Sequence, residues 1–338
     1  MRLFLSSSIV FLLFVSSKAQ TGYAKPDFAV QYLSYFGIGS KSVQRAAVIG
    51  NNAANYALMQ EALPDLTDQG LGIPVSFYKN TIESCGADKL IDALIADYDK
   101  MNQKDLEPRL RAISESIKKA TISKNLKNQL KNAIGEFYRG KKIRLSSSPN
   151  FQAAKGASTF TVTSSVEDLG SNLALVYASF WNPDNFNAMI ARLENKDLDS
   201  KQLAVGVLVT QAFEYGYAIG RVQTDYTTKT PSINILSKRK SSTERIGFPS
   251  FESKWYRTYQ KAEKTPVFVD NAALTPTVRA LQKAMLVLDP ILRSNVSKSK
   301  TLFNKDYSAV FTFVIKKTEA GEFVIRLQQP ELQLQAKK

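Results

Sequence analysis

This sequence of 338 residues contains no histidine and only one cysteine, Cys85. The absence of histidine excludes Ser-His-Asp and Cys-His catalysis, histidine metal ligands and a phosphohistidine relay within the chain. A single cysteine allows no intrachain disulfide, and a zinc site would need carboxylates for almost all its ligands. We therefore expect no metal centre, and we interpret Cys85 as a small buried hydrophobic residue.

Long apolar runs are also missing. A short one lies near the beginning of the sequence. Residues 3–15 are mostly apolar, follow Arg2 and come before the small residues Ser17 and Ala19. This pattern is typical of a secretory signal peptide cleaved after Ala19 or Gln20. The run of about 13 residues is shorter than the roughly 20 that cross a bilayer. We predict a secreted or periplasmic protein whose mature chain has no transmembrane segment.

Acidic residues are outnumbered by basic ones, 30 to 45, which gives a net charge of +15. Loss of Arg2 and Lys18 with the signal peptide lowers this charge by two, to +13. Such a charge favours anionic partners, namely nucleotides, acidic glycans or an acidic surface. The basic clusters are Lys118-Lys119, Lys141-Lys142-Arg144, Lys238-Arg239-Lys240 and Lys298-Lys300. None is interleaved with aromatic residues, so we expect no specific nucleic-acid partner.

The hydrophobic periods alternate between helix and strand, which predicts a mixed α+β protein. Helices are predicted at 53–59, 88–98, 110–117, 126–137, 166–181 and from Thr275 onward. Strands are predicted at 71–78, 142–145, 160–163, 203–209, 217–224 and 232–236, before a closing hairpin of 310–315 and 323–327. Pro74 places the first strand at a sheet edge, whereas the continuous apolar run 203–209 indicates a buried central strand. The Ser-, Ala- and Gly-rich residues 146–158 are predicted to form a loop.

Several segments share a pattern with one enzyme family. They are Gly50-Asn51-Asn52-Ala53-Ala54-Asn55, Gly72-Ile73-Pro74-Val75-Ser76-Phe77, Ile143-Arg144-Leu145-Ser146-Ser147-Ser148-Pro149-Asn150, Val176-Tyr177-Ala178-Ser179-Phe180-Trp181-Asn182, Val205-Gly206-Val207-Leu208-Val209-Thr210-Gln211 and Ile325-Arg326-Leu327-Gln328-Gln329-Pro330. In this order, the segments resemble the nucleotide-binding domain of phosphoenolpyruvate synthase and pyruvate phosphate dikinase. The resemblance extends from about residue 44 to residue 332, which is nearly the whole mature chain.

The resemblance implies a two-lobed ATP-grasp fold that binds ATP and Mg²⁺. It divides the chain into a signal peptide at 1–20, an N-terminal lead at 21–43, an N-terminal lobe at 44–200 and a C-terminal lobe at 201–338 that ends in a β-hairpin. A nucleotide would lie in a cleft between the two lobes.

The charged residues that the family uses are replaced at the matching positions. The lysine of the opening motif falls on Asn52, the second arginine of the strand on Ser146, and the final arginine on Gln329. The metal-binding glutamate falls near Thr312, and the acidic pair of the serine loop falls on residues 152–153, which are Gln and Ala. Phosphoryl transfer needs cations and metal ions around the phosphates. We therefore expect ATP and Mg²⁺ to bind weakly or not at all.

Four further residues complete the predicted nucleotide site. Arg144 lies two residues before Ser146, so both side chains project from the same face of a strand, and the arginine can replace a lost phosphate contact. Ser147 and Ser148 offer hydroxyl groups to an anion, and Gln211 lies where this fold reads an adenine edge. Each residue also has a purely structural interpretation: a surface arginine, loop serines and a polar residue at a strand end.

Three functions remain open at this point. The favoured one is a catalytically inactive module that keeps the framework and binds a nucleotide or another anion. The second is an active ATP-dependent phosphotransferase with rearranged ligands such as Arg144, Glu244 and Glu252. The third is a basic protein that binds an acidic glycan or surface.

Overall fold

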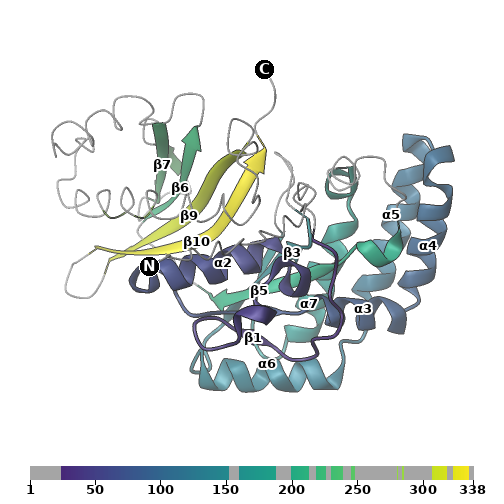
Figure 1. Ribbon diagram of the computed structural model, residues 1–338, viewed down its shortest axis with the longest axis horizontal. Helices are drawn as coiled ribbons and strands as arrows, with labels where there is room; N and C mark the ends of the chain where they lie inside the picture. The colour runs from purple at the N-terminus through teal and green to yellow at the C-terminus, as the bar shows by residue number, and fades with distance from the viewer. Residues whose placement is uncertain are drawn as a thin grey trace, which may run out of the picture.

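The computed structural model describes residues 24–151, 160–187, 199–212, 218–225, 230–238, 245–247, 307–317 and 323–334, together with Ala280 and Ala284. These residues form helices and two five-stranded sheets in which every strand pair is antiparallel (Figure 1). The predicted mixed α+β class is confirmed. The predicted signal peptide and the helix predicted from Thr275 lie outside the described residues.

The first sheet has the strand order β1-β2-β5-β3-β4. Its strands are β1 (Ser34–Tyr35), β2 (Gly70–Ile73), β5 (Val205–Gln211), β3 (Ile143–Pro149) and β4 (Thr161–Ser164). Strand β5 is buried up to its last residue and pairs with β2 and β3, as the apolar run at 203–209 predicts. Strand β5 begins after residue 200, where the sequence places the boundary between the two lobes. The first sheet therefore includes one strand from the predicted C-terminal lobe.

Helices cover both faces of the first sheet. One face packs against α3 (Val75–Ser84), α4 (Ala87–Asp97), α5 (Gln103–Lys118), α6 (Lys124–Glu136) and α7 (Leu169–Ala178). The other face carries α1 (Ala46–Ile49) and α2 (Asn51–Ala62). Ser123 caps the start of α6, because its hydroxyl accepts a hydrogen bond from the Leu126 amide at 3.3 Å.

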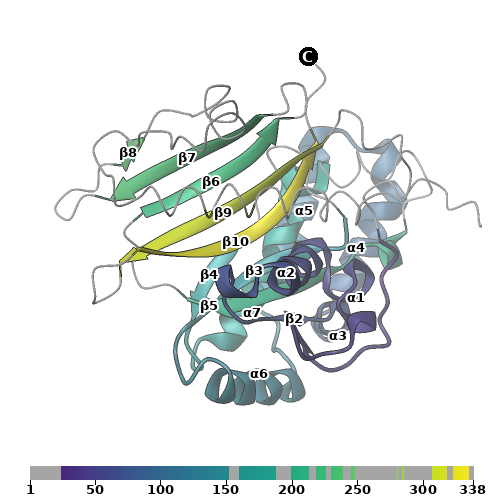
Figure 2. The same ribbon diagram turned by 60° about the vertical axis from the view of Figure 1, so that its left-hand side comes forward.

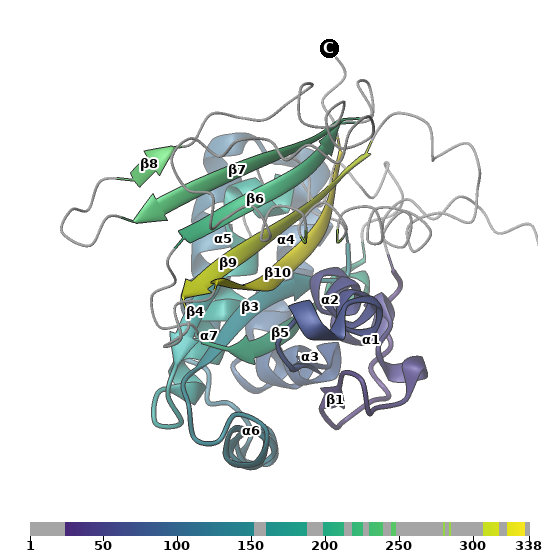
Figure 3. The same cartoon turned by 90° about the vertical axis from the view of Figure 1, so that its left-hand side faces the viewer.

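The second sheet has the strand order β10-β9-β6-β7-β8. Its strands are β10 (Phe323–Leu334), β9 (Tyr307–Lys317), β6 (Ala218–Asp225), β7 (Thr230–Lys238) and β8 (Arg245–Gly247). The closing hairpin of β9 and β10 is confirmed. Helix α2 lies between β10 and the first sheet, so it contacts both sheets (Figures 2 and 3).

Three local predictions are wrong. The strand predicted at 71–78 ends at Ile73, and α3 begins at Val75 directly after Pro74, whose fixed φ suits the start of a helix. Strand β2 is also not at an edge, because it lies between β1 and β5. In the predicted loop, residues 146–149 continue β3, since β5 offers each of them a ladder partner. Backbone pairing therefore overrides the turn preference of serine.

The junction of α1 and α2 lies directly on the first sheet. Gly50 has φ of 78°, and a Cβ there would come within 1.7 Å of the Ser148 carbonyl oxygen. In β5, a Cβ on Gly206 would come within 2.2 Å of the Ile49 carbonyl oxygen. Only glycine fits at these two positions, so the glycines set the distance between helix α2 and the sheet.

Tyrosines are buried in the core between the first sheet and α3 to α7. The Trp181 indole donates a hydrogen bond to the Tyr78 hydroxyl at 3.0 Å, whereas the buried Tyr177 hydroxyl has no partner among the described residues. Burial raises the pKa of Tyr78 and Tyr177. On the other face of the sheet, burial also raises the pKa of Tyr56 in α2.

Alkaline pH should therefore unfold this protein. In the unfolded chain tyrosine ionises near pH 10, whereas these three tyrosines keep their protons in the folded state. The stability they contribute is present below about pH 10 and is lost as pH rises further. Urea unfolding at several values between pH 9 and 11.5, with tyrosinate absorbance at 295 nm, measures this loss. If all tyrosines, including Tyr56, Tyr78 and Tyr177, titrate near pH 10 while the protein stays folded, the prediction is wrong.

Candidate functional site

The N-terminus of α2 is capped by strand β3. No side chain within α2 or at its N-cap Gly50 caps the helix. Instead, the Ala53 amide donates to the Ser148 hydroxyl at 2.9 Å, and the Asn52 amide group donates to the Ser147 carbonyl oxygen at 2.9 Å. All three of these polar side chains, Asn52, Ser147 and Ser148, are buried. The predicted site residues at the two motifs therefore meet, but they bind one another.

The other serine hydroxyls of β3 also have partners within the protein. Ser146 and Thr161 share a hydrogen bond of 3.0 Å between their hydroxyls, and the Phe160 amide donates to the Ser147 hydroxyl at 3.0 Å. These contacts join β3 to β4. The hydroxyls predicted to bind phosphate thus hold the sheet together.

Asn150, at the end of the resembling segment, is fully buried and structural. Its side chain donates to the carbonyl oxygens of Ala24 and Gln202, both at 2.8 Å, and accepts from the Ala204 amide at 3.1 Å. Asn150 therefore joins the N-terminal segment, β3 and the start of β5.

Arg144 crosses from the first sheet to the second. Its guanidinium donates from Nη1 to the Gln328 side-chain oxygen on β10 at 2.6 Å. A β-bulge turns Gln328 inward: Leu327 pairs with Phe313 and Pro330 with Phe311, so residues 328 and 329 both lie opposite Thr312.

The Arg144 guanidinium is a largely buried cation with a neutral partner. Its Nε is buried and has no hydrogen-bond partner among the described residues, and no described carboxylate forms an ion pair with it. Burial lowers the pKa of this guanidinium. A buried charge without a counterion is unfavourable, so an anion that reached this position would stabilise it.

We define a seam cluster of five residues: Arg144, Gln328, Tyr56, Asp68 and Arg326. Tyr56 and Arg144 each act on the pKa of the other, and Asp68 and Arg326 both act on the pKa of Tyr56. Asp68 pairs with Arg326 Nε at 3.1 Å through one oxygen, while its other oxygen is buried and lacks a described partner. The Tyr56 hydroxyl donates to the Asp68 carbonyl oxygen at 2.9 Å. The pKa of Tyr56 is raised first by burial and then by the Asp68 carboxylate, and Arg144 acts in the opposite direction.

The structure separates Gln211 from the seam cluster. Gln211 pairs with Ile143, whereas Arg144 pairs with Thr210. Paired residues project from the same face of a sheet and successive residues from opposite faces, so Gln211 and Arg144 lie on opposite faces. Thr312 lies opposite the bulge and is half-buried.

Gln329 belongs to the bulge backbone, but its neighbour Gln328 makes the contact with Arg144. Sequence reasoning missed Gln328 because a bulge changes which of two successive residues points inward.

The seam cluster does not fit a magnesium-bound triphosphate. Its one carboxylate, Asp68, is paired with Arg326. Among the described residues, no three carboxylate or cysteine side chains gather where they would hold a metal ion. Glu244 and Glu252, the carboxylates proposed for an active enzyme, lie outside the described residues.

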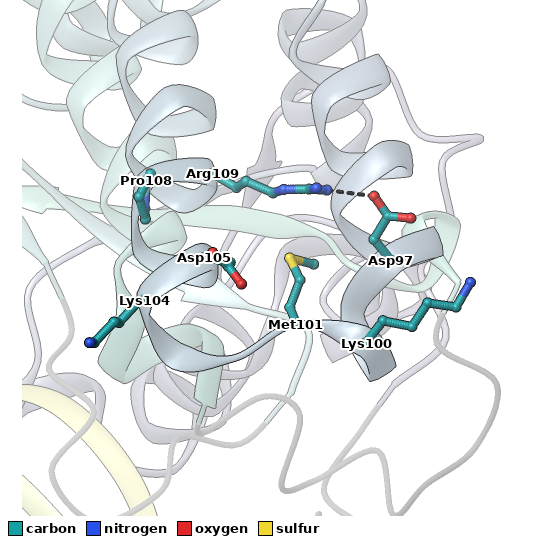
Figure 4. A pocket seen from close by; sticks show the side chains of 7 residues that line it. All are labelled: Asp97, Lys100, Met101, Lys104, Asp105, Pro108 and Arg109. Carbon is teal, nitrogen blue, oxygen red and sulfur yellow. Dashed lines mark hydrogen bonds and ion pairs between the residues drawn. The ribbon is translucent and has the colours of Figure 1, made fainter.

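A separate hollow of about 460 Å³ lies between α4 and α5. Figure 4 shows Arg109 reaching across it to Asp97, an ion pair of 2.8 Å, while Lys100 and Lys104 point away from its centre. Asp105 lines the same hollow, so its charges are mixed and its central arginine is neutralised. This hollow has no preference for an anion comparable to that of Arg144.

Ser148→Ala tests the cap that β3 gives to α2. The variant leaves the buried Ala53 amide without its acceptor, so we expect a loss of about 1–2 kcal/mol in the free energy of unfolding. Ser171→Ala is the matched control, because Ser171 is exposed and bonds only within its own helix end. Urea unfolding of both variants measures the difference, and equal stabilities would contradict the cap.

Gln328→Met tests whether the Arg144 charge is buried. The variant removes the described hydrogen-bond acceptor of Arg144, so we expect destabilisation of about 2 kcal/mol. The double variant Arg144→Met with Gln328→Met removes the charge as well and should recover this loss or exceed the stability of the parent. If Gln328→Met unfolds like the parent protein in urea, the guanidinium is solvated and the interpretation is wrong.

No protein-family model and no curated protein matches this chain. Among the helices that the structure describes, none has the length and apolar character needed to cross a bilayer. The inference of function therefore depends on the contacts of the seam cluster and on the segments around it.

Proposed function

We propose that this chain is an exported, two-lobed ATP-grasp-like domain of the phosphoenolpyruvate synthase and pyruvate phosphate dikinase type that no longer transfers phosphate. In this proposal it binds an anionic ligand, a nucleotide in the first instance, at the seam cluster. The arrangement of the resembling segments supports it. The Gly50 motif, the strand that carries Arg144 and the strand that carries Gln328 converge on α2 from positions far apart in the sequence.

The contacts of the motif residues support the loss of phosphotransfer. In-line transfer of a phosphoryl group requires several cations and a metal ion to neutralise the developing charge, and one such contact is worth about 3–4 kcal/mol. The seam cluster supplies one arginine without a carboxylate partner, and its carboxylate is paired with Arg326. Asn52, Ser146 and Ser148 are bonded within the protein.

The single observation that carries the binding proposal is the Arg144 guanidinium. Its buried Nε has no partner among the residues that the structure describes, and Nη1 is bonded to the neutral Gln328. A phosphate or carboxylate accepts well from two guanidinium nitrogens at once and would also neutralise the buried charge. Gln328 would then act as a replaceable acceptor that holds the guanidinium in place until the anion arrives.

Arg144→Gln tests the proposal. Isothermal titration calorimetry with ATP, AMP, phosphoenolpyruvate and inorganic phosphate, each with and without Mg²⁺, should detect binding that Mg²⁺ does not strengthen. Arg144→Gln should lower the affinity at least tenfold, because hydrogen bonds to a charged group contribute about 1.5–3 kcal/mol. Arg111→Gln, an exposed arginine on α5, controls for the loss of one positive charge.

Two results would overturn parts of this proposal. Binding of none of the four anions would end the anion-binding function. Phosphate release from Mg-ATP that disappears in Arg144→Gln would end the inactive interpretation and support the phosphotransferase with rearranged ligands.

A further inference from the structure

Helix α6 presents an outer face made of lysine and asparagine. Three Lys-Asn pairs repeat along it at intervals of three and four residues, and their six side chains are exposed: Lys124-Asn125, Lys127-Asn128 and Lys131-Asn132. This spacing places the pairs on one side of the helix. The opposite side is buried against the first sheet and its helices through Leu126, Leu130 and Ile134.

Basic residues continue beyond both ends of α6. Residues 118–142 contain eight Lys or Arg and one acidic residue, Glu136, which gives this segment a net charge of +7. The preceding segment, residues 87–117, contains five basic and seven acidic residues. Charge is therefore separated between neighbouring helices, and almost half of the net charge of +15 lies in 25 residues.

The cations of this segment have few ion pairs. Lys118 pairs with Glu115 at 2.7 Å, but no other lysine or arginine in residues 119–142 forms an ion pair with a residue that the structure describes. These like charges repel one another and attract counterions from solvent. An anionic chain that displaced those counterions would gain their release as free energy.

Arg139 adds an exposed cation just beyond α6, in an unusual backbone conformation. It has φ of 50°, and within the described part of the chain it is the one residue other than glycine with a positive φ. Glycine or asparagine adopts this conformation with less strain, and Gly140 follows with φ of 71°. Arg139 thus lies in a strained conformation three residues beyond the end of α6 and two before Lys141, where glycine would fit the backbone better.

We propose that the α6 face, defined as Lys124, Lys127, Lys131, Arg139 and Lys141, binds an acidic polysaccharide. The described side chains of α6 include no exposed apolar group that would enter a bilayer. They also include no exposed aromatic ring on which a base would stack. Ammonium groups pair with carboxylates or sulfates, and the neighbouring asparagine amides hydrogen-bond sugar hydroxyls. Lys124 and Lys131 lie about 10 Å apart along the helix axis, so one extended polyanion reaches both.

This face is separate from the seam cluster. Helix α6 lies on the face of the first sheet opposite α2, and the three views agree that it is on the far side from the second sheet (Figures 1–3). The α6 face therefore does not rest on the proposed nucleotide site, and each is testable without the other.

Heparin and polygalacturonate, a sulfated and a carboxylated polymer, are the probes for the test. The variant Lys124→Gln/Lys127→Gln/Lys131→Gln should lose at least tenfold in affinity by calorimetry at 50 mM salt, and its binding should depend less steeply on salt. The control is Lys89→Gln/Lys100→Gln/Lys104→Gln, which removes three exposed charges from α4, the turn after it and the first turn of α5. We expect less than a threefold loss in the control. Equal losses in the two triple variants would overturn the proposal, because net charge alone would then explain binding.

Arg139→Gly separates binding from folding. Relief of the positive φ should raise the melting temperature, while the loss of charge should weaken polysaccharide binding by threefold or more. A variant that melts higher and binds as well as the parent would remove Arg139 from the site. Tighter binding to phosphatidylserine vesicles or to duplex DNA than to both polysaccharides, at equal salt, would overturn the choice of partner.

Discussion

The structure depends on the close approach of the α1–α2 junction to strand β3. Gly50 leaves no space between the helix start and the Ser148 backbone, and Ser148 supplies the cap that α2 cannot supply for itself. This contact fixes the height of α2 above the first sheet. Because β10 packs on the other side of α2, the same contact also determines how far the second sheet lies from Arg144.

This constraint explains why the motif residues are poor candidates for catalysis. A hydroxyl that caps a helix or joins two strands is already bonded, and its exchange for a phosphate contact would weaken the framework. The serines and Asn52 are therefore structural. In the seam cluster, Arg144 is the charged residue that has no ion pair with a described carboxylate. We infer that anion binding is compatible with this framework, whereas phosphotransfer is not.

The sequence predicted most of the fold where a long periodic pattern was present. Helix α6, the central strand β5 and the closing hairpin were all predicted, because their patterns depend on burial alone. The prediction failed where tertiary pairing competes with local preference. Pro74 began a helix instead of marking an edge strand, and residues 146–149 joined a ladder with β5 instead of forming a loop.

The candidate site was less predictable than the fold. The strand register decides that Gln211 and Arg144 lie on opposite faces, and a bulge decides that Gln328 faces inward. Neither the strand register nor the bulge can be read from the amino-acid composition or from the hydrophobic periodicity of the sequence. The sequence pointed to Arg144 as a candidate cation but gave no sign of its contact with Gln328.

The cap on α2 also bears on how the chain reaches its native state. Ala53 and its acceptor Ser148 are separated by 95 residues, and Arg144 and Gln328 by 184. Contacts of such separation require closure of long loops before they contribute stability, which slows folding. Helix α2 alone is 12 residues long and lacks a cap of its own, so it is marginal in isolation. We therefore expect α2 to become stable only when β3 is in place, so that helix and sheet form in one cooperative step.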